Sequence, residues 1–300
     1  MDILVADDDP GSRNVLATLL ETMGHTVATV DDGTAALAAL AKGRYPLLIS
    51  DWLMPGLDGL SLCRAVRAQS GAPYTYIILI TAMDGPANYL DGIDAGADDF
   101  IGKPVDPKYL IARLHVAERI LSLHERLRNQ ATHDHLTGLL NRGAILEALD
   151  QEMQRAAREG HHLGVLMVDL DHFKPVNDAH GHPVGDTVLR ETARRMQSSL
   201  RPYDRIGRYG GEEFLVVVPG EPPAVITEIA ERIRLAVAAD AVTTAVGDIA
   251  VTVSIGVATS NGSACEAGHL VGVADDALYR AKAAGRNRVE PCAPLQPDET

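Results

Sequence analysis

The sequence predicts an α/β protein of two domains, with a doubly wound parallel sheet first, a helical connector next and an α+β domain last. Three observations support this fold class. Residues 2–103 alternate short apolar segments with amphipathic ones, residues 108–137 contain neither glycine nor proline, and the second half has a "GG" pair followed by an apolar run. A chain of 300 residues is long enough for about two domains of ordinary size.

Five apolar segments of the first half are the expected strands: "ILVA", "VATV", "LLIS", "YIILI" and "DDFI". The helical stretches between them favour a parallel sheet with helices on both faces. Ligands bind such sheets beyond the carboxyl ends of the strands, near the point where the strand order reverses. Polar residues follow four of the expected strands there, namely Asp7 and Asp8, Asp51, Thr81 and Lys103. The alternative is that each is an ordinary loop residue.

Together these polar residues suit phosphoryl transfer to a carboxylate. Asp7 and Asp8 can hold Mg²⁺, which prefers oxygen ligands and bridges to phosphate oxygens. Asp51 is then the expected nucleophile. Thr81 can donate a hydrogen bond to a new phosphoryl oxygen, and Lys103 can pair with its charge.

The motifs "VADDDP", "SDWLMPGLDG", "LITA" and "FIGKP" resemble those of response-regulator receiver domains, over about residues 1–125. The resemblance implies a flavodoxin-like fold with Asp51 as the phosphoacceptor and the Leu53 carbonyl as a further metal ligand. It also implies that Phe100 is the aromatic switch residue, acting with Thr81 and Lys103. A sensor histidine kinase is the implied phosphodonor.

The connector, about residues 106–131, is expected to be one helix. Val116, Ile120, Leu123 and Leu127 recur at alternating spacings of four and three, which is typical of a short coiled-coil seam. The alternative is a terminal helix that packs this face on its own domain. Its place between two domains favours a homodimer, in which phosphorylation would tighten or rotate the helix pair.

An expected strand in "LGVLMVDLDHF" alternates so that Leu166, Val168 and Leu170 face one side while Asp169 and Asp171 face the other. In "RYGGEEFLVVV" the glycines predict a tight turn, followed by a buried strand. If this hairpin pairs beside the first strand, Asp169, Glu212 and Glu213 converge, and metal would relieve their repulsion. An acidic, solvated hairpin tip is the alternative.

This second half, residues 132–290, resembles the GGDEF family of diguanylate cyclases, from "DHLTGLLNR" to "AKAAGRNRV". The resemblance implies a palm-like cyclase that condenses two GTP molecules into cyclic di-GMP and two pyrophosphates. Its metal ligands would be Asp169, Glu212 and the Leu170 carbonyl, assisted by Glu213, with Mg²⁺ or Mn²⁺ as the ion. Gly210 and Gly211 would leave room for the nucleotide.

The resemblance also assigns substrate residues, each with an ordinary alternative. Asn177 and Asp186 would read the guanine edge, but both residue types also cap helices. Lys174, Lys282 and Arg286 would hold the triphosphate, although each could be a surface residue. Lys282 and Arg286 are four apart and expected on one helix face. A metal cluster at His172, His180 and His182 is rejected, because the family lacks a histidine-bound metal and Mg²⁺ prefers oxygen.

The segment "RPYD" matches the inhibitory RxxD site of the family. Arg201 and Asp204 would bind product there, with Arg232 contributed by a neighbouring domain. The expected function is therefore a phosphorylation-controlled diguanylate cyclase with product feedback. Two alternatives stay open: a catalytically silent receptor of cyclic di-GMP that acts through a protein partner, and a cyclase for another nucleotide.

Composition limits the partners and the compartment. The net charge of −14 argues against general binding to nucleic acid or an anionic membrane. There is no apolar run long enough to span a bilayer and no signal peptide, so we expect a cytoplasmic protein. Cys63, Cys265 and Cys292 are not in metal-ligand spacing and are expected to be bystanders. The tail, residues 291–300, is rich in proline and polar groups and is expected to be disordered.

Overall fold

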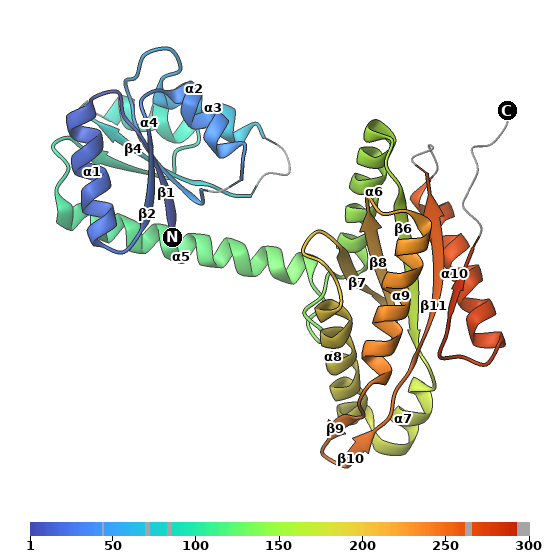
Figure 1. The fold of residues 1–300 in the computed structure, drawn as a ribbon. Helices are drawn as coiled ribbons and strands as arrows, with labels where there is room; N and C mark the ends of the chain where they lie inside the picture. Colours follow the sequence, from blue (N-terminus) through green and yellow to red (C-terminus); the bar gives the residue numbers. More distant parts are fainter. Residues whose placement is uncertain (44, 70–72, 83–85, 262–265, 293–300) are drawn as a thin grey trace. The chain divides into compact units, whose positions relative to one another are not determined.

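A computed structural model describes residues 1–292 except residues 44, 70–72, 83–85 and 262–265. The chain divides into two compact units, Met1–Arg128 and Asn129–Thr300 (Figure 1). This division lies between the domain limits expected from the sequence, residues 125 and 132. Each unit is described by itself below.

The N-terminal unit is built on a parallel sheet with the strand order β2-β1-β3-β4-β5. All five strands lie where the apolar segments predict them: β1 (Asp2–Ala6), β2 (Thr26–Val30), β3 (Leu47–Asp51), β4 (Tyr76–Thr81) and β5 (Asp99–Gly102). The order reverses between β1 and β3. The carboxyl ends of these two strands therefore flank the position at which doubly wound sheets bind ligands.

Helices cover both faces of this sheet (Figure 1). Alternate strand residues face opposite sides, so Ile3 and Val5 pack in one core and Leu4 packs in the other. Residues of α1 (Pro10–Thr22) and α5 (Pro107–Thr132) complete the first core, and residues of α2 (Gly33–Leu40) and α3 (Gly59–Arg67) the second. Helix α4 spans Pro86–Asp94. The predicted doubly wound fold is confirmed.

The connector is a single helix, α5. Its first half packs on the N-terminal unit through Leu110 and Leu114, and Ile120 is partly buried against the same core. The other members of the expected seam are exposed: Val116 by 42%, Leu123 by 48% and Leu127 by 63%. Packing on its own domain thus accounts for Ile120 but leaves three apolar seam residues in solvent. The helix ends at Thr132, before the first glycine of the second unit.

The C-terminal unit contains a sheet with the strand order β12-β11-β6-β8-β7. Its strands are β6 (Leu163–Leu170), β7 (Arg205–Gly210), β8 (Glu213–Pro219), β11 (Val253–Ser260) and β12 (Val289–Pro291). Neighbouring strands are antiparallel except β11 and β12. A small hairpin, β9 (Val242–Thr244) and β10 (Gly247–Ile249), stands apart, and the helices are α6 (Arg142–Glu159), α7 (Phe173–His180), α8 (His182–Ser198), α9 (Pro223–Ala238) and α10 (Ala267–Ala283).

The central strand β6 separates two apolar cores, as its alternation predicts. Leu166, Val168 and Leu170 pack on the side that contains buried residues of α8 and α9. Val165 and Met167 pack on the other side, with buried residues of α6 and α10. Asp169 continues this second series and therefore lies on the side of the sheet that α10 covers.

The sequence predicts a disordered tail over residues 291–300. Pro291 belongs to β12 and the Cys292 amide donates to the Val257 carbonyl at 2.8 Å, so the expected disordered tail is wrong at its start, because β11 offers backbone partners there. Residues 293–300 and Cys265 lie outside the described residues.

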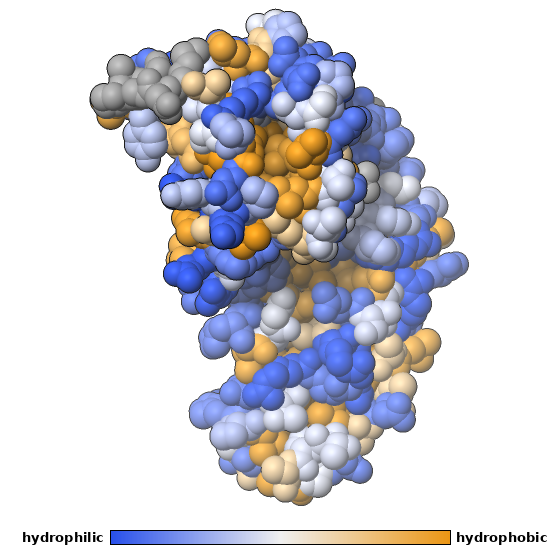
Figure 2. Space-filling view, turned by 90° about the vertical axis from the view of Figure 1, so that its left-hand side faces the viewer, coloured by the Kyte–Doolittle hydropathy of each residue, from blue (hydrophilic) through white to orange (hydrophobic). Residues whose placement is uncertain are grey.

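The surface is mixed in polarity. One face of the N-terminal unit has a patch of apolar residues surrounded by polar ones (Figure 2). In the part of the chain that the structure describes, no helix combines the length and the apolar character that crossing a bilayer requires.

Candidate functional sites

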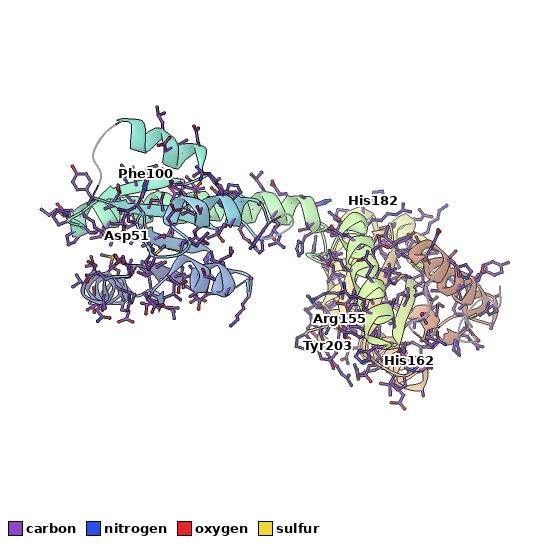
Figure 3. The ribbon with its side chains drawn as sticks, turned by 90° about the horizontal axis from the view of Figure 1, so that it is seen from above. Asp51, Phe100, Arg155, His162, His182 and Tyr203 are labelled. Atoms are coloured by element: carbon purple, nitrogen blue, oxygen red, sulfur yellow. The ribbon has the colours of Figure 1, made fainter. Side chains whose placement is uncertain are left out.

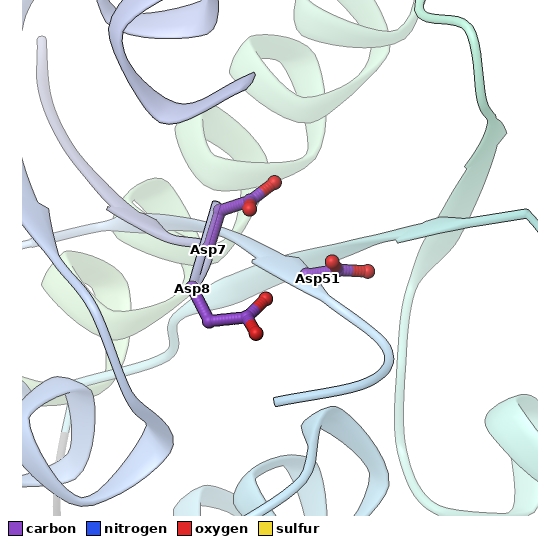
Figure 4. A group of neighbouring side chains, drawn as sticks. All are labelled: Asp7, Asp8 and Asp51. Atoms are coloured by element: carbon purple, nitrogen blue, oxygen red, sulfur yellow. The ribbon is translucent and has the colours of Figure 1, made fainter. Parts of the chain in front are cut away.

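Three carboxylates gather at the carboxyl ends of β1 and β3 (Figure 4). Asp7, Asp8 and Asp51 each offer an oxygen, and these oxygens lie within 4.8 Å of one another. Asp7 and Asp51 are buried, whereas Asp8 is exposed. Burial raises the pKa of Asp7, although a backbone hydrogen bond from Asp9 and the charge of Lys103 oppose that effect. Such an oxygen-only donor set fits a hard divalent cation.

Lys103 connects two of these acids. Its Nζ lies 2.7 Å from Asp51 Oδ2 and 3.4 Å from Asp7 Oδ2. Burial by itself would lower the pKa of Lys103, but its hydrogen bond to Asp51 and the nearby negative charges outweigh burial and raise that pKa. The ammonium is thus held beside the carboxylate expected to accept a phosphoryl group.

The other predicted receiver residues lie around this edge. The Lys103 amide donates to the Thr81 carbonyl at 2.8 Å, so Thr81 and Lys103 are adjacent at the ends of β4 and β5. The ring of Phe100 is 4.7 Å from that of Tyr89 and 6.3 Å from that of Trp52, measured between centroids. Leu53 follows β3 and is 59% exposed. Figure 3 shows Asp51 and Phe100 in the same unit.

A second acidic group lies in the C-terminal unit, where β6 and β8 run side by side. Asp169 is directly opposite Glu213 in the strand register, and the Leu170 amide donates to the Glu212 carbonyl at 3.3 Å. Directly opposed residues project from the same face of a sheet. Glu212 and Gly211, whose φ is 44°, form the turn between β7 and β8. The predicted hairpin beside the carboxylate strand is confirmed.

Lys282 reaches this acidic group from α10. Its Nζ is 2.8 Å from Asp169 Oδ2, and the Asp169 side chain is only 9% exposed. Burial raises the pKa of Asp169, and the charges of Glu212 and Glu213 add to that effect while Lys282 opposes it. In the described residues the three carboxylates do not form a cluster as tight as that of Asp7, Asp8 and Asp51. Asp169 thus lies opposite Glu213 in the sheet, and its ion-pair partner is Lys282.

Arg208 ties the glycine turn to the start of the unit, and the sequence did not single it out. Its Nε donates to the Gly211 carbonyl at 2.9 Å, and its Nη1 lies 3.2 Å from both carboxylate oxygens of Asp134. Burial alone would raise the pKa of Asp134, but hydrogen bonds from Thr137 and the charge of Arg208 outweigh it and hold that pKa below its usual range. Asp134 lies two residues beyond the end of α5. Asp134 belongs to the segment "DHLT" and Arg208 to "RYGG". The two residues are 74 positions apart, and no local sequence pattern indicates that they form an ion pair.

The two residues expected to read guanine lie inside helices rather than at caps. Asn177 belongs to α7 and Asp186 to α8, so the alternative of helix capping is wrong. The helices pack so closely that a Cβ on Gly185 would lie 1.9 Å from Asn177 Oδ1. That oxygen is buried and has no hydrogen-bond partner within the described protein. This oxygen therefore packs against Gly185 in the interface between the two helices.

Lys174 and the three histidines His172, His180 and His182 lie in or next to α7 and α8. Lys174 is exposed on α7. His172 precedes that helix with φ of 57°, while His180 and His182 flank Gly181 between α7 and α8. In the described residues these histidines are not among the groups whose atoms could share a metal ion.

Arg286 is not where the sequence placed it. α10 ends at Ala283, and Gly285, Arg286 and Asn287 all have positive φ, of 112°, 63° and 45°. The chain therefore turns sharply after the helix, and the expectation that Lys282 and Arg286 share one helix face is wrong. The physical reason is Gly285, which ends the helix in the left-handed region.

The RxxD segment forms a compact turn before β7. The amide of Arg201 donates to Asp204 Oδ2 at 2.9 Å, and the amide of Asp204 donates to the Arg201 carbonyl at 3.1 Å. The Arg201 guanidinium is bound to Glu221 and to the Tyr203 hydroxyl. Burial raises the pKa of Asp204, with opposing contributions from Arg201 and Arg232. Arg232 donates through Nε to the Ser199 carbonyl at 2.9 Å.

A cavity of about 280 Å³ lies beside this turn. Tyr203 lines it together with Arg155 of α6 and His162 at the start of β6 (Figure 3). His162 Nδ1 is buried without a hydrogen-bond partner among the described residues. The turn thus borders a cavity that is lined by both charged and apolar residues.

Comparison with known families now assigns both units. Residues 3–115 match the model of the response regulator receiver domain, and residues 131–288 match that of the diguanylate cyclase, GGDEF domain. The chain belongs to the GGDEF family. Its GGDEF domain carries the acids of β6 and β8, and its receiver domain carries the acids of β1 and β3.

Individual GGDEF relatives extend the match. The response regulator PleD of Caulobacter vibrioides is 34% identical over 296 residues, which is 96% of this chain but 65% of PleD. The diguanylate cyclase DosC of Escherichia coli K12 is 38% identical over 189 residues, 61% of this chain and 41% of DosC. The chain thus spans less than two thirds of either relative.

Solved structures agree with this assignment. The coiled coil and GGDEF domain of DgcB from Caulobacter crescentus, solved in complex with c-di-GMP, is 33% identical and superposes with a TM-score of 0.56. The match covers 62% of this chain and 98% of that structure.

Proposed function

We propose that this protein is a diguanylate cyclase controlled by phosphorylation of its receiver domain. The observation that carries the proposal is the strand register that places Asp169 directly opposite Glu213 and next to the turn residue Glu212, with Lys282 2.8 Å from Asp169. The identity to DosC and PleD supports the same activity. The reaction would join two GTP molecules into cyclic di-GMP and release two pyrophosphates.

The chain's own residues would bind and orient GTP. Lys282, Lys174 and Arg286 supply positive charge for the triphosphate, and the Gly210–Gly211 turn leaves the backbone open to close approach. At both acidic sites, a bound Mg²⁺ or Mn²⁺ would neutralise charge on phosphate oxygens. In the cyclase domain Asp169 and Glu212, with the Leu170 carbonyl, would hold it, assisted by Glu213. In the receiver domain Asp7, Asp8, Asp51 and the Leu53 carbonyl would do so.

Guanine recognition would rest on Asn177 and Asp186. The Asn177 amide offers both a donor and an acceptor, its Oδ1 having no partner among the described residues, and the carboxylate of Asp186 can accept from the N–H groups of a guanine edge. An adenine edge presents a different pattern of donors and acceptors. We therefore propose GTP rather than ATP as the substrate, and incubation with both nucleotides followed by product analysis would detect mixed products.

Two subunits are required, because each domain would bind one GTP and the two nucleotides must face each other. The exposed apolar residues of α5, Val116, Leu123 and Leu127, support a homodimer that forms through this helix. Phosphorylation of Asp51 by a histidine kinase would add negative charge beside Lys103 and change the receiver surface near Thr81 and Phe100. The phosphodonor and GTP would both be available in the cytoplasm, which supports a cytoplasmic location.

Product feedback would act through the RxxD turn. Arg201 and Arg232 supply guanidinium donors for guanine or phosphate, and Asp204 has one buried oxygen, Oδ1, without a partner in the described chain. The bond between Arg201 and Glu221 would have to open when product binds. Arg201→Ala should therefore weaken inhibition by cyclic di-GMP without lowering initial turnover.

The decisive experiment is a turnover assay with purified protein, Mg²⁺ and GTP, with and without an acyl phosphate. Cyclic di-GMP should form, and faster after acyl-phosphate treatment. Asp51→Asn should remove only the acceleration. No product under either condition would refute the proposal.

A second candidate is a catalytically silent receptor of cyclic di-GMP, in which the ion pair between Lys282 and Asp169 would take the place of a metal ion. Glu212→Ala separates the two. A cyclase loses turnover and keeps product binding at the RxxD turn, whereas a silent receptor has no turnover to lose.

A further inference from the structure

Asp171 is a buried carboxylate to which neither the sequence motifs nor the proposed catalytic machinery gives a role. It follows β6 and is 6% exposed. Its Oδ1 accepts from the Ser254 hydroxyl at 2.7 Å, and its Oδ2 accepts from the Thr252 hydroxyl at 2.7 Å and the Asn287 amide at 3.0 Å. Burying a carboxylate is costly unless hydrogen bonds compensate it. Here one carboxylate joins the β11 region to the loop after α10.

The loop that Asp171 binds has an unusual backbone. Arg286 and Asn287 are consecutive residues with positive φ, and neither is glycine. Side chains disfavour this conformation, so the surrounding structure must impose it. Besides the bond to Asp171, the Asn287 side chain accepts from Arg234 Nη1 at 2.9 Å, and the Arg286 amide donates to the Ala281 carbonyl at 3.1 Å.

Both ends of the segment from Lys282 to Asn287 are tied to the end of β6. Lys282 Nζ is 2.8 Å from Asp169 Oδ2, and the Asn287 amide is 3.0 Å from Asp171 Oδ2. Arg286 lies between these two attachments. β6 carries the proposed metal ligand Asp169. The residue after the next one, Asp171, therefore also fixes the backbone of the loop that carries Arg286, a proposed triphosphate ligand.

We propose that Asp171 is a positioning residue for substrate binding, which holds the loop 285–287 so that Arg286 can contact the triphosphate of GTP. The inference rests on the proposed function, since it takes GTP as the substrate. Preorganised loops bind more tightly because they lose less conformational freedom on binding. Without the carboxylate, Arg286 has to be ordered by the ligand itself.

A double-mutant cycle tests this route in the full-length protein, with the dissociation constant of a nonhydrolysable GTP analogue measured by calorimetry in the presence of Mg²⁺. Asp171→Ala and Arg286→Ala should each weaken binding by about tenfold, as expected for loss of one charge-assisted contact. The double variant should be no weaker than Arg286→Ala, because Asp171 acts through Arg286.

Conservative variants separate positioning from a general structural role. Asp171→Asn should restore binding to within about threefold of the original protein, because its amide oxygen can accept from Asn287 while its NH₂ group donates to Ser254. Ser254→Ala, the matched control, removes the 2.7 Å hydrogen bond to Asp171 Oδ1, which does not reach the loop, and should weaken binding less than threefold. Cyclic di-GMP affinity at the RxxD turn should be unchanged in all variants.

Losses that multiply in the double variant, unchanged analogue binding by Asp171→Ala, or an Asn variant as weak as the Ala variant would overturn the inference. If Asp171→Ala does not fold, the same cycle is measured with Arg234→Met in its place. That change removes the hydrogen bond from Arg234 to the Asn287 side chain and so releases the loop by a second route. Arg234→Met should also weaken binding only when Arg286 is present. Failure of the original protein to make cyclic di-GMP would instead refute the proposed function.

Discussion

Replacing Arg208 by methionine tests whether the glycine turn of the cyclase domain is held from the start of that domain. Arg208 and Asp134 have side chains that are 18% and 15% exposed, and Nη1 lies 3.2 Å from the carboxylate. Two unit charges at about 3.2 Å attract by roughly 5 kcal/mol at an effective dielectric of about 20. Desolvation cancels much of this attraction, so we expect a coupling of about 1.5 to 3 kcal/mol.

The assay is a double-mutant cycle on urea unfolding, with Arg208→Met, Asp134→Asn and the double variant. Asp134→Asn retains an oxygen for the Thr137 amide and hydroxyl, which isolates the contact with Arg208. Only Arg208→Met also removes the hydrogen bond to the Gly211 carbonyl, so it should reduce turnover more than Asp134→Asn does. A coupling energy below about 0.5 kcal/mol, or equal turnover in the two single variants, would refute the reasoning.

Three further predictions concern stability and reactivity. Gly256→Ala should destabilise the C-terminal unit by about 1 to 3 kcal/mol in urea unfolding, because a Cβ there would lie 2.1 and 2.2 Å from backbone atoms of α10. Gly268→Ala is its control, since nothing lies within 4 Å of that Cβ, and equal stability of the two variants would contradict the prediction. Cys63 should resist alkylation at pH 8 until the protein is unfolded, because it is 0% exposed and burial raises its pKa to about 12; mass spectrometry should find Cys292 modified before Cys63. Two arginines lower the pKa of Glu191 from 4.5 to about 2, so its contribution to stability is complete above about pH 4.5 and is lost as the pH falls toward 2. Glu191→Gln should therefore lower the unfolding free energy at pH 6 and have no effect near pH 2, as measured by denaturant titration at each pH.

Local patterns predicted most of the architecture. The five strands of the receiver sheet lie at the five apolar segments. Of these, β1, β3 and β4 are buried almost throughout, and a strand buried on both faces must be apolar along its whole length. The alternation in β6 predicted that Asp169 and Leu170 face different sides of the sheet, since the side chains of a strand alternate between its two faces. The "GG" pair predicted the turn before β8. Helix α5 followed from a run without glycine or proline.

The sequence by itself determined the strands, the turn and the polar residues that end each strand. These features depend on residues that are near neighbours in the chain. Only the tertiary structure showed that Arg208 binds Asp134, that Lys282 pairs with Asp169, and that Asp171 holds the loop at Asn287. Each of these contacts joins residues far apart in the chain, and each depends on how helices pack over a sheet rather than on a local period. The course of the chain at Arg286 was decided in the same way, by a glycine that ends α10 and a buried carboxylate that fixes the turn after it.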